Sequence, residues 1–137
     1  MTHPTDPATV ALRPDVADAL SKGGIVDITT TGRRSGEQRR IEIVFFSFDG
    51  HLYISGMPGR RSWYANLQDD PRLTLHLKQG VTADLPARAR LVTDPTERRA
   101  ILARVTRVWK REAQLEAYVA GSPLIEVILG AETALAA

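Results

Sequence analysis

The sequence predicts a mainly β domain with helices, in which six antiparallel strands close into a barrel. Strand-like segments follow one another through tight turns, so neighbouring segments should pair antiparallel. The regular alternation of strand and helix that a Rossmann or TIM fold requires is missing. The chain has 137 residues, which suits one domain with one core. We expect a loose tail over residues 1–11, a domain over 12–130 and a second tail over 131–137.

The first predicted element is a short helix that begins near Pro14. Proline suits a first helical turn, and the pair Gly23-Gly24 supplies a stop. Apolar residues recur every four positions through this segment: Leu12, Val16 and Leu20.

Three strands are predicted next, over residues 25–31, 38–48 and 51–55. The first is rich in β-branched residues, which favour strands. The second and third are joined by Asp49-Gly50, a strong two-residue hairpin signal. The run from Ile41 to Phe48 is apolar on both faces at its far end, which predicts a central strand.

A short helix over residues 63–68 is expected after a glycine-rich loop, with Ser62 as its cap and its end before Pro71. Alternating apolar residues then predict strands over residues 73–77 and 81–91. Pro86 lies within the second of these strands and indicates an edge strand or a bulge.

A long helix is predicted from Pro95 to about residue 120. Asp94 and Glu97 resemble a capping box at its start, and Gly121-Ser-Pro123 ends it. Its apolar face would carry Ile101, Val105, Val108, Leu115 and Val119, with Trp109 beside them. Residues 124–129 form the last predicted strand.

Composition excludes several classes of function. The chain has no cysteine, which removes disulfides, iron–sulfur clusters and cysteine nucleophiles, and its three histidines form no recognisable metal motif. No Ser-centred hydrolase motif occurs. The net charge of +2 argues against general nucleic-acid binding. No apolar run approaches the ~20 residues of a membrane span, and no leader is evident, so the cytoplasm is the expected location.

Two segments are candidates for ligand binding. The first is the turn Gly32-Arg33-Arg34-Ser35-Gly36 with the following Arg39 and Arg40. Exposed backbone amides, a hydroxyl and several guanidinium groups together suit a phosphate or carboxylate. An arginine-rich hairpin that keeps a sheet edge soluble is the alternative interpretation.

The second candidate is the loop from Ser55 to Arg61, followed by Trp63 and Tyr64. Glycine and proline allow a flat ligand to approach the backbone, and the next helix directs its positive N-terminus toward it. Alternatively, both rings simply pack on the barrel.

These segments resemble the deazaflavin-dependent nitroreductase family of actinobacteria. The resemblance covers residues 25–91 and rests on four motifs in order. They are T-T-G-R-R-S-G-x-x-R from Thr30, Ile54-Ser55-Gly56, W-Y-A-N-L from Trp63, and D-D-P-R from Asp69. The resemblance implies a split β-barrel related to FMN-binding, pyridoxamine-phosphate-oxidase-like barrels. It also implies coenzyme F420, a deazaflavin with a phospholactyl polyglutamate tail, as cofactor.

The resemblance assigns residues to parts of this cofactor. The phosphate and acidic tail would be held by Arg33, Arg34, Ser35 and Arg39. The ring and the phosphate side would contact Ser55, Gly56, Met57, Pro58, Gly59, Arg60, Arg61, Trp63, Tyr64 and Asn66. Trp63 and Tyr118 would border the substrate pocket. The family's Ser-Lys-Gly-Gly stretch is absent here, and Arg60 or Arg61 would replace its lysine.

The resemblance therefore implies hydride transfer from reduced F420 to a small electron-poor acceptor, such as a quinone, a nitro compound or an activated alkene. No metal is expected, since the cofactor supplies the chemistry. The alternatives are an FMN- or haem-binding barrel, a non-catalytic carrier of an anionic cofactor, and a small nucleic-acid-binding barrel. The sequence leaves open whether the protein is a monomer or a homodimer.

Overall fold

Six antiparallel strands close into a barrel in the computed structural model, which describes residues 12–130. They are β1 (Gly24–Thr31), β2 (Gln38–Phe48), β3 (His51–Ser55), β4 (Arg72–Leu77), β5 (Ala83–Leu91) and β6 (Leu124–Leu129). Around the barrel they follow the order β1-β2-β3-β6-β5-β4, and β4 closes it by pairing with β1. The predicted fold class is confirmed. The two expected tails, 1–11 and 131–137, lie outside the described residues.

Pro86 does not mark an edge strand, contrary to the prediction, because β5 pairs with β4 on one side and β6 on the other. Pairing between β5 and β6 begins only at Ala87, opposite Leu129. The Pro86 carbonyl accepts a hydrogen bond from Gly130 N at 3.1 Å, just beyond the end of β6. Proline has no N–H to donate. Because position 86 lies opposite a residue beyond the end of β6, no hydrogen bond between the two strands is lost.

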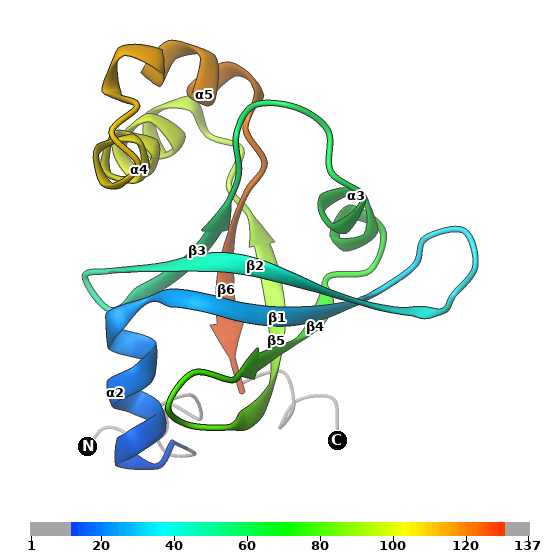
Figure 1. Cartoon of the computed structure of the whole chain (residues 1–137). Helices are drawn as coiled ribbons and strands as arrows, with labels where there is room; N and C mark the ends of the chain where they lie inside the picture. Colours follow the sequence, from blue (N-terminus) through cyan, green and yellow to red (C-terminus); the bar gives the residue numbers. More distant parts are fainter. Residues whose placement is uncertain (1–11, 131–137) are drawn as a thin grey trace, which may run out of the picture.

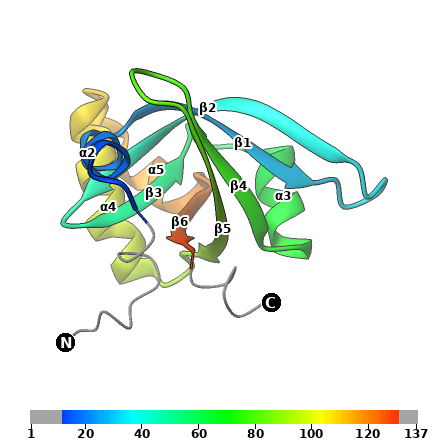
Figure 2. The ribbon, with the colours of Figure 1, turned by 90° about the horizontal axis from the view of Figure 1, so that it is seen from below.

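The helices lie outside the barrel (Figure 1). They are α2 (Pro14–Lys22), α3 (Ser62–Asp69), α4 (Pro95–Val108) and α5 (Leu115–Gly121), with a 3₁₀ turn over Glu112–Gln114. Both views show α3 beside the turn between β1 and β2, while α4 and α5 lie together (Figures 1 and 2). No helix within residues 12–130 combines the length and the apolar character needed to cross a membrane.

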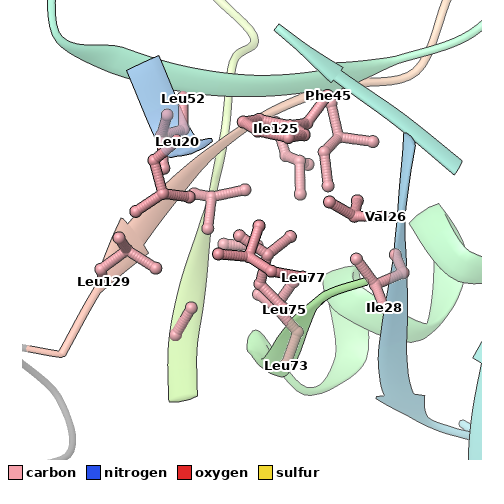
Figure 3. Close-up of a cluster of buried hydrophobic side chains, with 14 of the residues drawn as sticks. Leu20, Val26, Ile28, Phe45, Leu52, Leu73, Leu75, Leu77, Ile125 and Leu129 are labelled. Atoms are coloured by element: carbon pink, nitrogen blue, oxygen red, sulfur yellow. The ribbon is translucent and has the colours of Figure 1, made fainter. Parts of the chain in front are cut away.

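The core has two parts, one inside the barrel and one beneath α4 and α5. Inside, side chains from all six strands meet α2 and α3, as Figure 3 shows for Val26, Leu75 and Ile125. The second part joins α4 and α5 to the outer surface of β2 and β3. Phe45 belongs to the inner cluster and Phe46 to the outer one. The prediction that β2 is apolar on both faces and central is confirmed.

The predicted long helix is wrong, because α4 ends at Val108 and α5 starts at Leu115. Lys110 has a φ of 57°, the left-handed conformation that ends many helices. Its N–H donates to Arg107 O at 3.2 Å, and the Arg111 N–H donates to Thr106 O at 2.7 Å. These two bonds form a Schellman motif. The sequence does not predict this helix end, since glycine normally occupies the left-handed position of a Schellman motif.

Replacing Lys110 by glycine should stabilise the protein by about 0.5–1 kcal/mol, because glycine adopts positive φ without a Cβ clash. A β-branched residue, as in Lys110→Val, should destabilise it by more than ~1 kcal/mol. Urea unfolding of both variants tests this. Arg107→Gly is the matched control, since glycine in the last ordinary turn of α4 should cost about 1 kcal/mol. Equal effects of glycine at 107 and 110 would contradict this account of the helix end.

Candidate functional site

The turn between β1 and β2 is built around Gly32. Its N–H donates to Glu37 O at 2.7 Å, and its carbonyl accepts from Gly36 N at 2.8 Å. The Ser35 hydroxyl accepts a bond from Glu37 N at 3.1 Å. A Cβ on residue 32 would lie 2.9 Å from Ser35 Oγ and 3.2 Å from Glu37 O, so a side chain there would displace the Ser35 hydroxyl from its place in the turn. The turn thereby presents Arg33 and Arg34 at the surface between the two strands.

Asn66 joins this turn to α3. Its side-chain oxygen accepts two bonds from Arg33, from the backbone N at 3.1 Å and from Nη1 at 3.3 Å. Its amide nitrogen donates to Thr30 Oγ1 at 3.1 Å. Asn66 is only 4% exposed, so these bonds are shielded from water. The side chain of Asn66 therefore fixes both the turn and the direction of Arg33.

The loop between β3 and α3 is tied to the segment that connects α5 to β6. Gly59 N donates to Gly121 O at 3.0 Å, and the buried Ser55 hydroxyl donates to Pro123 O at 2.6 Å. Figure 1 shows this loop running past the end of α5. Arg61 folds back on the loop and donates to Met57 O at 3.0 Å. Gly59 has a φ of 132°, which disfavours any side chain.

The larger of the two cavities next to α3 has a volume of about 780 Å³, within the range of small-molecule sites. We call its two sides the near wall and the far wall. The near wall consists of Arg33, Gly59, Arg60, Arg61, Ser62, Tyr64, Ala65 and Gln68. The far wall consists of Thr93, Arg98, Ala120, Gly121, Ser122 and Pro123.

A smaller cavity of about 410 Å³ lies on the other side of the α3 N-terminus. Its lining residues come from β1, the following turn, β2 and α3: Thr30, Gly32, Arg33, Arg34, Ser35, Arg39, Ile41, Ser62, Trp63 and Asn66. The two cavities share Arg33 and Ser62. They adjoin, and the N-terminus of α3 lies between them.

Ser62 is the first residue of α3 and not its cap, which corrects the sequence prediction. Arg61 occupies the cap position and makes no side-chain bond to the helix. The first-turn amides of α3 therefore have no capping side chain, and Ser62 borders both cavities. Uncapped amides at a helix N-terminus bind phosphate oxygens well, through their hydrogen bonds and the helix dipole.

The arginines around these cavities lack the acidic partners found elsewhere. In the described part of the chain, no carboxylate is within ion-pair distance of Arg33, Arg34, Arg60 or Arg61, and Arg39 reaches Glu37 only at 3.7 Å. Other arginines are paired: Arg40 with Asp27, Arg72 with Asp70, Arg90 with Glu97, Arg99 with Glu116, and Arg104 with Asp49. Lys78 and Arg40 hold the pKa of Asp27 below its ordinary value. The site thus keeps positive charge available for an anionic ligand.

The structure brings most of the expected site residues together. The four residues assigned to the phosphate and tail all line the smaller cavity, with Trp63 and Asn66. Gly59, Arg60, Arg61 and Tyr64 line the larger one. Trp63 is also part of the core at 7% exposure, so its packing on the barrel is confirmed, while its contact with a ligand stays a prediction. The roles assigned to these residues remain predictions.

Five expected site residues lie elsewhere. Ser55, Gly56, Met57 and Pro58 support the loop and line neither cavity. Tyr118 has no exposed surface and packs in the outer cluster beneath α4 and α5, so its side chain is separated from both cavities. Sequence reasoning missed the far wall entirely. Its residues come from three separate segments, and only the tertiary fold gathers them.

Comparison with known families and structures identifies the protein class. A family model described as F420H(2)-dependent quinone reductase matches residues 10–124. The chain belongs to this family. It is therefore an F420-dependent oxidoreductase, and coenzyme F420 replaces the FMN and haem alternatives. No curated protein matches its sequence.

Solved structures share the fold at low sequence identity. One is a conserved hypothetical protein from Mycobacterium tuberculosis, with a TM-score of 0.69, 15% identity, and coverage of 86% of this chain and 80% of that one. An F420-H2 dependent reductase has a TM-score of 0.55, 20% identity, and coverage of 76% and 93%. An F420 reductase has a TM-score of 0.58, 18% identity, and coverage of 83% and 93%. The predicted split-barrel fold is confirmed.

The residues present fit this cofactor. Its phosphate and acidic tail require several positive groups, and the arginines without acidic partners supply them beside the uncapped α3 N-terminus. Its flat ring requires a wider space next to backbone, and the larger cavity, of about 780 Å³, has the backbone of Gly59 and Gly121 in its lining. When bound, the cofactor supplies the hydride, and the protein supplies orientation and charge.

Replacing Asn66 by alanine should weaken F420 binding about tenfold, because Arg33 loses the acceptor that directs it. The double variant Asn66→Ala/Arg33→Ala should bind no more weakly than the worse single variant, since both changes remove one arrangement. Fluorescence titration of the cofactor measures this. Thr30→Val is the control, as it removes only the acceptor of the Asn66 amide nitrogen and keeps the acceptor for Arg33. Fully additive losses would show that Asn66 does not act through Arg33.

Proposed function

We propose that this enzyme transfers a hydride from reduced F420 to a small quinone bound in the larger cavity. The observation that carries the proposal is the pair of adjoining cavities with arginines that lack acidic partners. Family membership supports a quinone as the acceptor. Nitro compounds and activated alkenes are the alternative acceptors, since both take up a hydride at an electron-poor centre.

In this proposal the smaller cavity holds the acidic end of the cofactor. Arg34 and Arg39 contact the tail, while Arg33 and the α3 amides contact the phosphate. Support comes from geometry, because Asn66 directs Arg33 toward the point where the two cavities meet. Charge-assisted contacts of this kind contribute on the order of 1.5–3 kcal/mol each. Several of them together would select a polyanionic tail over a single phosphate.

The larger cavity receives the ring and the acceptor in this proposal. Tyr64 and the loop from Gly59 to Arg61 form the surface that orients the ring, and the far wall faces the acceptor. Hydrogen bonds from Gly59 to Gly121 and from Ser55 to Pro123 keep the two walls at a fixed separation. Fixed separation matters because hydride transfer depends on close alignment of the reacting atoms.

Two further points remain part of the proposal. Trp63 borders the cofactor from the core side of the smaller cavity. Tyr118 acts behind the far wall, where its carbonyl accepts a bond from Arg98 at 3.3 Å.

The cytoplasmic location expected from the sequence fits an enzyme that shares a diffusible cofactor with other enzymes.

Purified protein should oxidise reduced F420 when 2-methyl-1,4-naphthoquinone is added, and it should not use reduced FMN in its place. F420 should bind at least ~10²-fold more tightly than FMN, since more charge-assisted contacts are available to its tail. Stopped-flow absorbance and fluorescence titration measure the two quantities. Tight F420 binding without quinone reduction would reject the quinone and leave nitro compounds and alkenes to be tried. Tighter binding of FMN would reject the assignment of the arginines.

Reversing the charge of Arg34 should raise the KM for F420 roughly ten- to a hundredfold and leave kcat nearly unchanged. A tail contact stabilises ground state and transition state equally, so its loss appears in KM. Raised salt should reduce wild-type affinity in the same direction, because exposed charges are screened over about 8–10 Å. Arg88→Glu is the matched control, as it changes net charge equally on an exposed residue that lines neither cavity. If Arg34→Glu lowers kcat with KM unmoved, Arg34 does not anchor the tail.

A further inference from the structure

Arg98 is the main polar link within the far wall of the larger cavity. It projects from α4 to four backbone carbonyls. Nε donates to Val119 O at 3.0 Å, and Nη1 to Val92 O at 3.0 Å. Nη2 donates to Ser122 O at 2.7 Å and to Tyr118 O at 3.3 Å. A guanidinium held by four bonds has little freedom to move.

The charge of Arg98 is not neutralised by the protein. In the described part of the chain no carboxylate pairs with it, and its bonds go to uncharged carbonyls. An arginine has five N–H groups, so one remains without a protein acceptor among residues 12–130. Arg98 borders the cavity directly. The far wall therefore contains a fixed positive charge with one donor available.

Ser122 provides a second, independent observation at the same wall. It borders the larger cavity and is 4% exposed, yet its buried hydroxyl has no hydrogen-bond partner in the described structure. A buried hydroxyl without a partner costs free energy unless a ligand or water satisfies it. The Ser122 carbonyl is bound by Arg98, so the unpaired hydroxyl and the unpaired N–H belong to adjoining groups. This wall thus contains two donors without a protein acceptor among residues 12–130.

We propose that Arg98 and Ser122 form the site for the acceptor's oxygen, and that this site favours acceptors whose oxygen is or becomes negatively charged. This inference rests on the proposed function, since it names the residues that contact the acceptor. The near wall and the smaller cavity already contain the arginines suited to the cofactor. The far wall faces them across the cavity and carries its own separate charge.

The chemistry of the acceptor explains why such a site is useful. A hydride brings two electrons and one proton to the quinone, and the reduced cofactor is oxidised by two electrons. The quinone becomes a hydroquinone monoanion, and a proton from water then completes the hydroquinone. A rigid cation and a hydroxyl donor at the developing negative oxygen stabilise the transition state more than the neutral quinone.

The test compares two naphthoquinones of similar size, one of them neutral and the other negatively charged. 2-Methyl-1,4-naphthoquinone is neutral, and 2-hydroxy-1,4-naphthoquinone is an enolate at neutral pH that mimics the monoanion. Calorimetry measures the binding of each to the protein loaded with oxidised F420, so no turnover is needed. The variants are Arg98→Gln, Arg98→Lys and Ser122→Ala. Arg99→Gln is the matched control, because the neighbouring Arg99 pairs with Glu116 and lines neither cavity.

Arg98→Gln should weaken binding of the enolate roughly ten- to a hundredfold and change binding of the neutral quinone by less than about threefold. Arg98→Lys should retain part of the preference for the enolate over the neutral quinone. Lysine keeps the positive charge but cannot make the four hydrogen bonds of the guanidinium. Ser122→Ala should weaken enolate binding about two- to tenfold. Affinity for F420 should stay within about twofold in all variants.

Other results would overturn the inference. If Arg98→Gln lowers the melting temperature but retains the wild-type preference for the enolate, Arg98 only holds the helices together. If Arg98→Gln weakens the binding of both quinones equally, the same conclusion about Arg98 follows. If Arg98→Gln does not fold, an unchanged preference in Arg98→Lys and Ser122→Ala together would reject the site. A wild-type protein that binds F420 but neither quinone would instead refute the proposed quinone reductase function.

Discussion

The hydrogen bonds of Asn66 are the constraint on which the site depends. The barrel fixes β1 and β2, and the apolar face of α3 packs into the inner core, but neither contact sets the direction of the turn between the strands. One buried amide does so, by accepting from Arg33 and donating to Thr30. Because Arg33 lines both cavities, the same bonds that dock α3 also direct a positive charge toward them. In the proposed function this side chain couples stability to cofactor binding, through three side-chain hydrogen bonds in a buried position.

Charge is distributed unequally over the molecule, and this inequality separates the site from the rest of the surface. On the outer barrel, Asp27 lies between Arg40 and Lys78, and Arg90 contacts both Glu97 and Glu126. Around the two cavities, Arg33, Arg34, Arg60 and Arg61 carry positive charge with no carboxylate within ion-pair distance among residues 12–130. Such an arrangement costs stability in the absence of ligand, and natural proteins accept this cost at functional sites. The anionic cofactor relieves it, so binding and stability should rise together.

The sequence predicted those features that local patterns determine. Alternation located β4 and β5, Asp49-Gly50 located the hairpin, and consecutive arginines located a turn that lines the smaller cavity. Local patterns failed where a residue departs from its usual conformation or where distant segments meet. Lys110 ends α4 in a conformation usually reserved for glycine, so the helix break was hidden. Arg98 looked like one more exposed residue of a charged helix, because its four acceptors lie 6 to 24 residues away.

The two walls of the larger cavity differ in origin, and this difference separates cofactor choice from acceptor choice. The near wall comes from the segment that also builds the smaller cavity, so in the proposed function its residues are constrained by the cofactor's phosphate and tail. The far wall comes from α4, α5 and the approach to β6, which have no contact with the smaller cavity. Hydrogen bonds from Gly59 to Gly121 and from Ser55 to Pro123 connect the loop between β3 and α3 to the far wall. In the proposed function, side chains of the far wall can therefore change without disturbing the arginines assigned to the cofactor, while these two hydrogen bonds hold the loop and the far wall at the spacing that hydride transfer would need.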